Sequence, residues 1–198
     1  APLPLWSAQA LLEAPDAVRQ LHEAYARAGA DILTANTFRA TPRALAKTGK
    51  APEAERLVDR AVALARDARE RARDSREVLI AGAVAPLEDC YRPDLVPPPE
   101  QAEREHAEQV IRLARAGVDL ILIETMNTIA EARAALRAAK PSGLPVFVSF
   151  ICRAPGELLS GEPLGDAVTA LAAFKPEAIL VNCSSPEWMP ACLEEMSR

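Results

Sequence analysis

Aromatic residues and histidines are scarce in this chain. Aromatic residues make up 4% of its 198 residues and there are 2 histidines, whereas hydrophobic residues as a whole make up 49%. This balance predicts an aliphatic interior of the α/β type, and the length suffices for one domain with a full core. Because His22 and His106 lie within helical patterns, the sequence does not indicate histidine-based catalysis.

The chain also lacks a surplus of basic residues. Its 23 lysines and arginines against 28 aspartates and glutamates give a net charge of −5. Nucleic acids and anionic membranes require a basic face, so we expect neither as the main partner. No long uncharged apolar run predicts a membrane-spanning helix, and the first residues do not resemble a signal peptide. We therefore expect a cytoplasmic location.

The chain has few cysteines and no glycine-rich loop of the usual phosphate-binding kind. The 4 cysteines, Cys90, Cys152, Cys183 and Cys192, are irregularly spaced, which is not typical of a disulfide framework, so we expect reduced thiols. Neither a Gly-x-Gly-x-x-Gly sequence nor a P-loop sequence occurs. This absence argues against nucleotide binding by the usual loops.

One helix-to-strand phrase occurs twice. Residues 26–33 and 114–121 match in type at every position, and in both a glycine, Gly29 or Gly117, closes a helical pattern. An aspartate, Asp31 or Asp119, then opens a run of aliphatic residues. Repetition of such a unit predicts parallel strands joined by crossover helices.

The chain reads as an alternation of helices and strands. We predict helices at residues 7–12, 15–28, 52–73, 100–116, 129–139 and 164–173, with shorter ones after residues 41 and 186. Strands are predicted at residues 31–38, 78–84, 118–125, 145–151 and 178–183. No antiparallel hairpin signal appears, so the sequence predicts a parallel α/β fold. Gly82, inside the second strand, predicts close approach by a neighbour or a ligand.

Glu124 ends the most apolar of these strands. An unpaired carboxylate is costly to bury, so a glutamate at this place is rarely there for packing alone. In parallel α/β folds the functional face lies at the carboxyl ends of the strands. We therefore predict a substrate-binding site at these ends, made of Asn36, Glu124, Thr125, Ser149 and Asn182, with the thiols of Cys152 and Cys183 at the ends of two of the strands.

This set suits a small zwitterionic or thiol substrate. Glu124 could accept hydrogen bonds from an ammonium group, and a cysteine could bind a soft metal. Simpler interpretations stay open: Glu124 pairs with an arginine, Cys183 is a small buried hydrophobic residue, and Asn36 and Asn182 bind loop backbone. Cys152 and Cys183 end consecutive predicted strands. Two cysteines are nevertheless weak evidence for zinc, which needs three or four ligands.

Several motifs together resemble the homocysteine S-methyltransferase family. They cover nearly the whole chain, and their order is more specific than any one of them. They are Pro4-Leu5-Trp6-Ser7-Ala8, Gly29-Ala30-Asp31-Ile32-Leu33-Thr34-Ala35-Asn36-Thr37-Phe38, Glu124-Thr125, Val148-Ser149-Phe150, Ser160-Gly161-Glu162-Pro163-Leu164 and Val181-Asn182-Cys183-Ser184-Ser185-Pro186.

The resemblance implies a (β/α)8 TIM barrel and zinc-dependent methyl transfer to the thiol of homocysteine, giving methionine. The implied donor is S-methylmethionine, betaine, or a methylated folate or cobalamin. By this likeness Cys183 corresponds to the first zinc cysteine of the family, and Glu124 to the carboxylate that binds the substrate amino group. The expected partners are therefore small molecules, and no residue is assigned to the chemical step itself.

Two family motifs are not found in these residues: an Asp-Gly-Gly-x-Gly-Thr stretch, expected before Pro4, and a Gly-Gly-Cys-Cys pair, expected after Arg198. The predicted strands would then be the second to sixth of a barrel. Residues 1–198 would form a single barrel domain that is either a piece of a longer barrel or a degenerate relative of the family. An incomplete barrel exposes strand edges, which predicts self-association.

Two other functions remain open. The chain could be a catalytically inactive, metal-free relative or fragment that binds a small amino acid or a partner chain. It could also be an aldolase-like or decarboxylating barrel enzyme with Glu124 as the acid or base. Such enzymes commonly use a lysine or histidine at a strand end, whereas the lysines here, Lys47, Lys50, Lys140 and Lys175, lie in predicted helices or loops.

Overall fold

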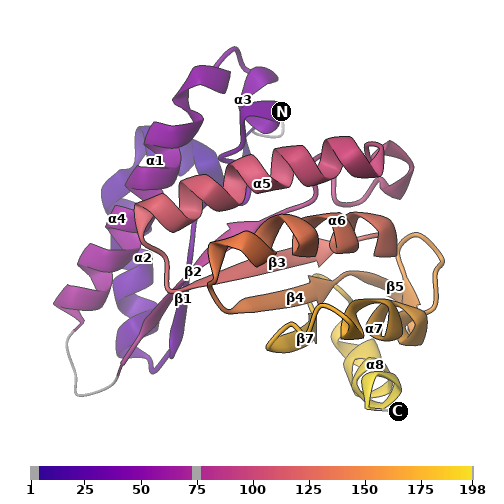
Figure 1. Cartoon of the computed structure of the whole chain (residues 1–198). Helices are drawn as coiled ribbons and strands as arrows, with labels where there is room; N and C mark the ends of the chain where they lie inside the picture. Colours follow the sequence, from indigo (N-terminus) through magenta and orange to yellow (C-terminus); the bar gives the residue numbers. More distant parts are fainter. Residues whose placement is uncertain (1–4, 73–76, 198) are drawn as a thin grey trace. The chain divides into compact units, whose positions relative to one another are not determined.

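The computed structural model describes residues 5–72 and 77–197 (Figure 1). Pro4 of the first motif and Arg73, the predicted end of a helix, lie outside this part. By its internal contacts the chain divides into two compact units, which are described separately here. The first comprises residues 1–83 and 109–121, and the second comprises residues 84–108 and 122–198.

The first unit contains short 3-10 turns at Trp6–Ala8 and Ala51–Glu53 and four complete helices. These are α1 (Gln9–Glu13), α2 (Pro15–Arg27), α3 (Pro42–Ala46) and α4 (Ala54–Arg71), together with strand β1 (Ile32–Ala35) and nearly all of β2 (Leu79–Val84). Helix α5 (Pro99–Ala116) and strand β3 (Leu120–Met126) contribute residues to both units.

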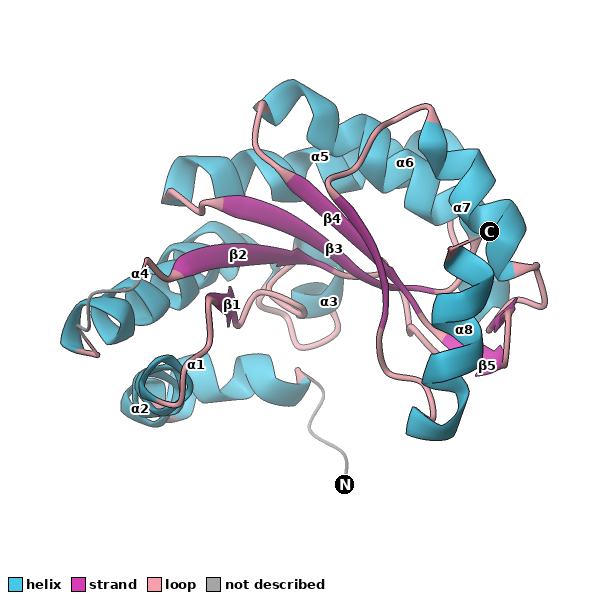
Figure 2. Ribbon diagram, turned by 90° about the horizontal axis from the view of Figure 1, so that it is seen from below, coloured by secondary structure: helices cyan, strands magenta, loops and turns pink. Residues whose placement is uncertain are grey.

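The second unit contains 3-10 turns at Pro93–Leu95, Lys140–Ser142 and Pro186–Trp188 and helices α6 (Ile129–Ala139), α7 (Leu164–Ala172) and α8 (Met189–Met196). Its strands are β4 (Val146–Phe150), β5 (Cys152–Ala154), β6 (Glu157–Leu158) and β7 (Ala178–Val181). Figure 2 shows α6 and α7 side by side, and the two helices are in contact.

Five strands form a parallel sheet in the order β1-β2-β3-β4-β7. In the first unit Ile32 pairs with Leu79, and in the second unit Phe150 pairs with Val181. The predicted α/β fold with parallel strands is therefore confirmed. The ends of each predicted strand agree with those of an observed strand to within three residues. The predictions of a single domain, of self-association and of a cytoplasmic location stay predictions.

One element was not predicted. Strands β5 and β6 form a small antiparallel hairpin, in which Cys152 pairs with Leu158 and Ala154 with Glu157. The expectation that the chain has no antiparallel hairpin is therefore wrong. Strands of three and two residues are too short to show an alternating pattern, although Pro155-Gly156 is a turn signal and Gly156 has a φ of 73°.

The repeated phrase forms the same local structure in both copies. Gly29 and Gly117 have φ values of 104° and 84°, so each takes the left-handed conformation that ends a helix. The aspartate of the second copy also has a structural role: Asp119 Oδ2 accepts hydrogen bonds from Ile80 N at 2.7 Å and from Arg69 Nη1 at 3.0 Å. Asp119 thus ties strand β2 and helix α4 together.

Gly82 is required by packing in the first unit. A Cβ atom at this position would lie 2.8 Å from Leu113 Cδ2 and 3.1 Å from Val118 Cγ1, which is too close for an ordinary contact. The predicted close approach at Gly82 is therefore made by neighbouring side chains.

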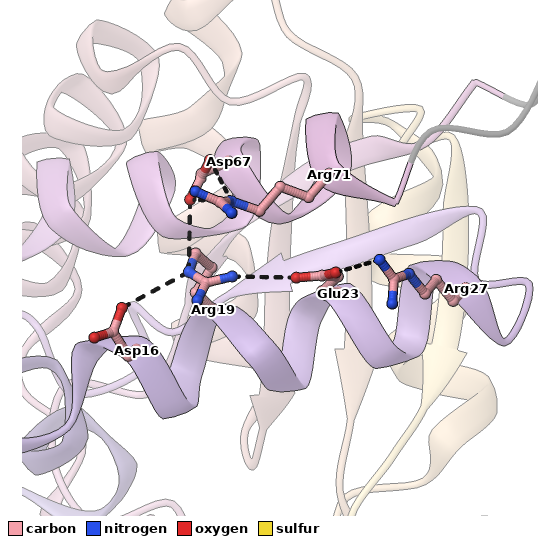
Figure 3. A network of polar contacts seen from close by, with 6 residues as sticks. All are labelled: Asp16, Arg19, Glu23, Arg27, Asp67 and Arg71. Carbon is pink, nitrogen blue, oxygen red and sulfur yellow. Dashed lines mark hydrogen bonds and ion pairs between the residues drawn. The ribbon is translucent and has the colours of Figure 1, made fainter.

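Charged side chains connect helices α2 and α4 in the first unit (Figure 3). Arg19 lies 3.1 Å from Glu23 of its own helix and 3.6 Å from Asp67 of α4, while Arg71 binds Asp67 at 2.9 Å. Asp16 and Arg27 extend the network along α2. Isolated surface pairs contribute little, so we expect most of the stability here to come from the buried face of α4, made of Leu57, Val58, Ala61, Val62, Ala65 and Ala68.

A buried polar contact accompanies the apolar core of the second unit. Glu131, on the first turn of α6, accepts a hydrogen bond from Leu87 N at 2.8 Å and lies 3.3 Å from His106 Nε2. Both side chains are buried. His106 of α5 is therefore a buried residue that contacts Glu131.

We expect Asp119→Ala to lower the free energy of unfolding by about 1 to 3 kcal/mol, because the buried Ile80 N–H would lose its acceptor. Urea denaturation measures this difference. Asp59→Ala, a change of the same kind on the exposed side of α4, is the control and should change the stability by a few tenths of a kcal/mol. Equal effects of the two substitutions would contradict this role of Asp119.

Candidate functional site

The carboxyl ends of β3, β4 and β7 bring five of the predicted residues together in the second unit. Glu124 and Thr125 lie near the end of β3, Ser149 lies near the end of β4, and Asn182 and Cys183 directly follow β7. The hydrogen bond from Asn182 N to Phe150 O, at 3.0 Å, extends the pairing of β4 and β7 by one residue. This hydrogen bond fixes the backbone from which the side chain of Asn182 extends.

The amide of Asn182 joins the three strand ends. Its Oδ1 accepts hydrogen bonds from Thr125 N at 3.2 Å and from Ser149 Oγ at 2.8 Å. Its Nδ2 donates to Thr125 Oγ1 at 2.8 Å and lies 3.5 Å from Glu124 Oε2 and 3.6 Å from Cys183 Sγ. Both the oxygen and the nitrogen of this amide therefore have hydrogen-bond partners, and these partners fix the orientation of the amide.

Two residues of the site have left-handed backbone conformations. Thr125 has a φ of 61° and Cys183 a φ of 50°, and neither is a glycine. This conformation costs a side-chain-bearing residue about 1 to 2 kcal/mol, and it persists where the surroundings hold it. The bond from Thr125 N to Asn182 holds the first of them. Residues strained in this way concentrate at binding and catalytic sites.

Glu124 has a strongly perturbed carboxyl group. Burial raises the pKa of its carboxyl from 4.5 to about 7, because the charged form loses solvation. No arginine or lysine pairs with Glu124 among the contacts of the described residues, so the simpler interpretation as a strand-mouth ion pair is not supported. A carboxylate in this state gains most from a cationic partner that arrives from solution.

Cys183 presents the only exposed thiol of the chain, since Cys90, Cys152 and Cys192 are buried. Its Sγ lies 3.8 Å from Thr125 Oγ1 and 3.6 Å from Asn182 Nδ2. The simpler interpretation of Cys183 as a small buried residue is therefore wrong.

The described residues contain no group of three or more His, Cys, Asp or Glu side chains that could hold a metal ion. Zinc needs three or four such ligands. Cys183 alone does not make a zinc site, and the atoms next to its sulfur, a hydroxyl and an amide nitrogen, are not usual zinc ligands. The residues that the structure describes therefore do not fit zinc by themselves.

Cys152 does not supply a second exposed ligand. Burial, a contact with the Cys192 thiol and the charge of that thiol raise the pKa of Cys152 to about 12. The backbone of Cys152 is held by the loop after β7, because its N–H donates to Ser184 Oγ at 2.8 Å. Cys152 is thus a structural residue beside the site.

Asn36 belongs to the first unit. Its Nδ2 donates to Ser7 O and its Oδ1 accepts from Ser7 Oγ, both at 2.8 Å. As the simpler interpretation had it, Asn36 binds loop backbone, here in the turn before α1. Its role in substrate binding stays a prediction.

The sequence analysis missed Ser184 and Tyr91. Ser184 Oγ accepts from Cys152 N and donates to Asn182 O at 2.9 Å, so it fixes the turn that carries Cys183. Partial burial, together with the charges of Cys183, Cys90 and Asp89, raises the pKa of Tyr91. Tyr91 lies in the loop before α5, and no sequence pattern distinguishes it there.

The loop of residues 160–163 supports the same end of the sheet. Glu162 Oε2 accepts hydrogen bonds from Ile129 N at 3.1 Å and from Ser160 Oγ at 2.6 Å, so it binds the first turn of α6. The backbone N–H of Ser160 donates to Asn127 O, just after β3. This motif therefore positions the segment that follows Glu124 and Thr125.

Comparison with known proteins decides the family. The homocysteine S-methyltransferase family profile matches residues 1–198. The chain belongs to this family. It is 34% identical to the homocysteine S-methyltransferase of Escherichia coli over 97% of the chain, and 29% identical to the S-methylmethionine–homocysteine S-methyltransferase BHMT2 of Mus musculus over 93%.

A solved structure confirms the fold. The metallated form of the homocysteine methyltransferase MmuM from Escherichia coli matches with a TM-score of 0.89 and 32% identity, over 98% of this chain and 72% of that one. The predicted (β/α)8 type of fold is thereby confirmed. This chain spans 66% of the Escherichia coli relative in sequence and 47% of the mouse relative. Among the described residues, no helix is long and apolar enough to cross a membrane.

The buried Glu124 makes stability depend on pH. Its pKa is raised in the folded state, so between about pH 4.5 and 7 the folded chain binds the proton more tightly than the unfolded chain does. Protonation of Glu124 therefore stabilises the fold below pH 4.5, and this stabilisation is lost as the pH rises to 7. We expect the stability of the natural chain relative to Glu124→Gln to fall by about 2 to 3 kcal/mol between pH 5 and pH 8. Urea unfolding at the two pH values measures it. Glu187→Gln, an exposed control, should show no such pH dependence, and a flat difference for Glu124→Gln would contradict the prediction.

Proposed function

We propose that this chain binds L-homocysteine through its ammonium group and serves the transfer of a methyl group to its thiol, giving methionine. The observation that carries the proposal is the convergence of a half-buried carboxylate without a cationic partner, Glu124, with the exposed thiol of Cys183 around one amide, Asn182. Membership of the homocysteine S-methyltransferase family supports it.

Each residue of the site has a proposed role. Glu124 accepts hydrogen bonds from the substrate ammonium, which favours the charged carboxylate and releases its proton on binding. Asn182 positions this carboxylate through its side-chain nitrogen, and Ser149 binds the oxygen of the same amide from the end of β4. Thr125 lies between Glu124 and Cys183, and Asn36 remains a proposed substrate-binding residue of the first unit.

In the proposed reaction the substrate sulfur attacks the methyl carbon of the donor in line. A sulfur–carbon bond forms while the bond between the methyl group and the donor breaks, so the contribution of this chain is to orient the sulfur. Zinc, which the family likeness implies, does not fit the described residues by themselves, because Cys183 is the one candidate ligand among them. No step is therefore assigned to the metal.

The donor remains to be identified among S-methylmethionine, betaine and methylated folate or cobalamin. The name of the mouse relative favours S-methylmethionine. This sulfonium donor has a chemical advantage: loss of its methyl group releases a neutral thioether. We therefore propose S-methylmethionine as the donor to test first.

A second function is favoured by the incomplete set of metal ligands. The chain would then bind an amino acid at Glu124 without catalysing methyl transfer. Both functions require the same ammonium site, and they differ in methyl transfer and in metal content.

We expect Glu124→Gln to weaken binding of L-methionine at least about tenfold, because a hydrogen bond from a charged ammonium contributes about 1.5 to 3 kcal/mol. L-Methionine has the amino and carboxyl groups of the product and no free thiol. Isothermal titration calorimetry at pH 6 should also show proton release by the natural chain and none by the variant. Glu187→Gln is the control, and equal affinities of all three proteins would refute the ammonium site.

Zinc content after dialysis separates the two functions: the described residues by themselves predict well below one zinc ion per molecule, because they contain no group of three or more side chains that could hold a metal ion. Elemental analysis of the natural chain and of Cys183→Ser measures it. Near-stoichiometric zinc that is lost in the variant would show that other residues complete the site, and it would favour methyl transfer over the binding-only function.

A further inference from the structure

We propose that the second unit has a further small-molecule site, between the first turns of α5 and α6, which binds a small aliphatic amine in its ammonium form. The inference goes beyond the proposed function, because this site shares no residue with the strand-end site around Asn182. Two observations carry it: a cavity with a largely apolar wall, and a buried carboxyl oxygen of Glu131 that has no hydrogen-bond partner among the described residues.

The cavity has the size and the lining of a site for a small molecule. Its volume is about 360 Å³, at the lower end of the range of about 300 to 1,000 Å³ that is usual for ligand pockets. One wall is formed by residues 96–99, which include three consecutive prolines, and by Ala102 of α5. The opposite wall is formed by Thr128, Ala130 and Glu131 at the start of α6. The aliphatic proline rings favour an apolar ligand body.

Contacts within the second unit fix both walls. Arg137 of α6 binds Glu103 of α5 at 2.6 Å, and Ala102 of α5 and Ala134 of α6 belong to one buried cluster. Proline has a fixed φ, so the segment 97–99 loses little conformational freedom when a ligand binds. The cavity is therefore largely preformed.

Glu131 supplies the polar group of the cavity. Its side chain is 0% exposed, and its Oε1 accepts a hydrogen bond from Leu87 N at 2.8 Å and lies 3.3 Å from His106 Nε2. Oε2 has no hydrogen-bond partner among the described residues. Because Glu131 lines the cavity and is itself fully buried, it lies at the inner end of the cavity. An oxygen removed from water without a partner is unfavourable, so a ligand that donates to Oε2 gains binding free energy.

The surroundings of Glu131 determine the charge of the ligand. Among the described residues no lysine or arginine pairs with Glu131, and its one ion-pair contact is with His106. A hydrogen bond from an ammonium group to a carboxylate is about twice as strong as one between neutral groups. A ligand that also carried a carboxylate would bring a second acid group into an apolar cavity, which disfavours amino acids. The ligand class is therefore a compact aliphatic amine without an acidic group.

Two probes test this class on the natural chain. Cyclohexylamine and cyclohexanol have the same ring, and they differ in an ammonium or a hydroxyl group. In heteronuclear NMR titrations we expect cyclohexylamine to shift the backbone amides of Leu87 and Ala130 and to bind there at least about tenfold more tightly than cyclohexanol. Equal affinities, or shifts confined to Thr125 and Asn182 of the strand-end site, would overturn the inference.

A cavity-filling substitution tests the location. Ala130 is exposed and lines the cavity, so Ala130→Phe fills it without entering the core, and we expect this variant to bind cyclohexylamine at least about tenfold more weakly. Ala63→Phe, the same change at an exposed alanine of α4, is the control and should bind like the natural chain. Unchanged binding by Ala130→Phe would contradict the location.

Glu131→Gln tests the carboxyl group. Glutamine keeps an oxygen for Leu87 N and replaces the second oxygen with a donor, so the preference for cyclohexylamine over cyclohexanol should disappear. A folded Glu131→Gln variant that keeps the preference would overturn the inference. If the variant does not fold, the two probes on the natural chain and the Ala130→Phe variant decide the outcome.

Discussion

The hydrogen bonds of the Asn182 amide are the constraint on which the candidate site depends. One carbonyl oxygen accepts from Thr125 N and from Ser149 Oγ, and the amide nitrogen donates to Thr125 Oγ1. An amide has a fixed number of donors and acceptors, so these partners determine its orientation. Because the three partners come from β3 and β4 while Asn182 follows β7, this side chain sets the spacing of Glu124 and Cys183.

The site contains energetically unfavourable features, and a ligand can offset part of their free energy. Thr125 and Cys183 have backbone conformations that are unfavourable for side-chain-bearing residues, and Glu124 is half-buried without a cationic partner. A folded chain tolerates these costs because the aliphatic strands and the buried faces of the helices stabilise the surroundings. An amino acid with an ammonium group would offset the cost at Glu124, which is the physical link between this structure and a homocysteine-binding family.

Much of the fold could be predicted from local patterns. The repeated phrase ending at Gly29 and Gly117 forms the same helix end in both copies, because only glycine takes a left-handed conformation without strain. The aliphatic runs form the parallel strands as expected. The hairpin of β5 and β6 was missed because its strands are too short to carry a period, and the role of Asp119 was missed because its partners are distant in sequence.

By itself the sequence determined the order of the elements, the family, and the nomination of Glu124 and Cys183, because periodicity, glycine positions and motifs are local properties of the chain. Only the tertiary structure decided which polar groups meet. It paired Ser149 and Thr125 with Asn182, bound Ser184 to the backbone on both sides of the turn that carries Cys183, and paired Asn36 with Ser7. Hydrogen bonds between side chains depend on distances of a few ångströms, and these are set only when strands far apart in sequence are packed together.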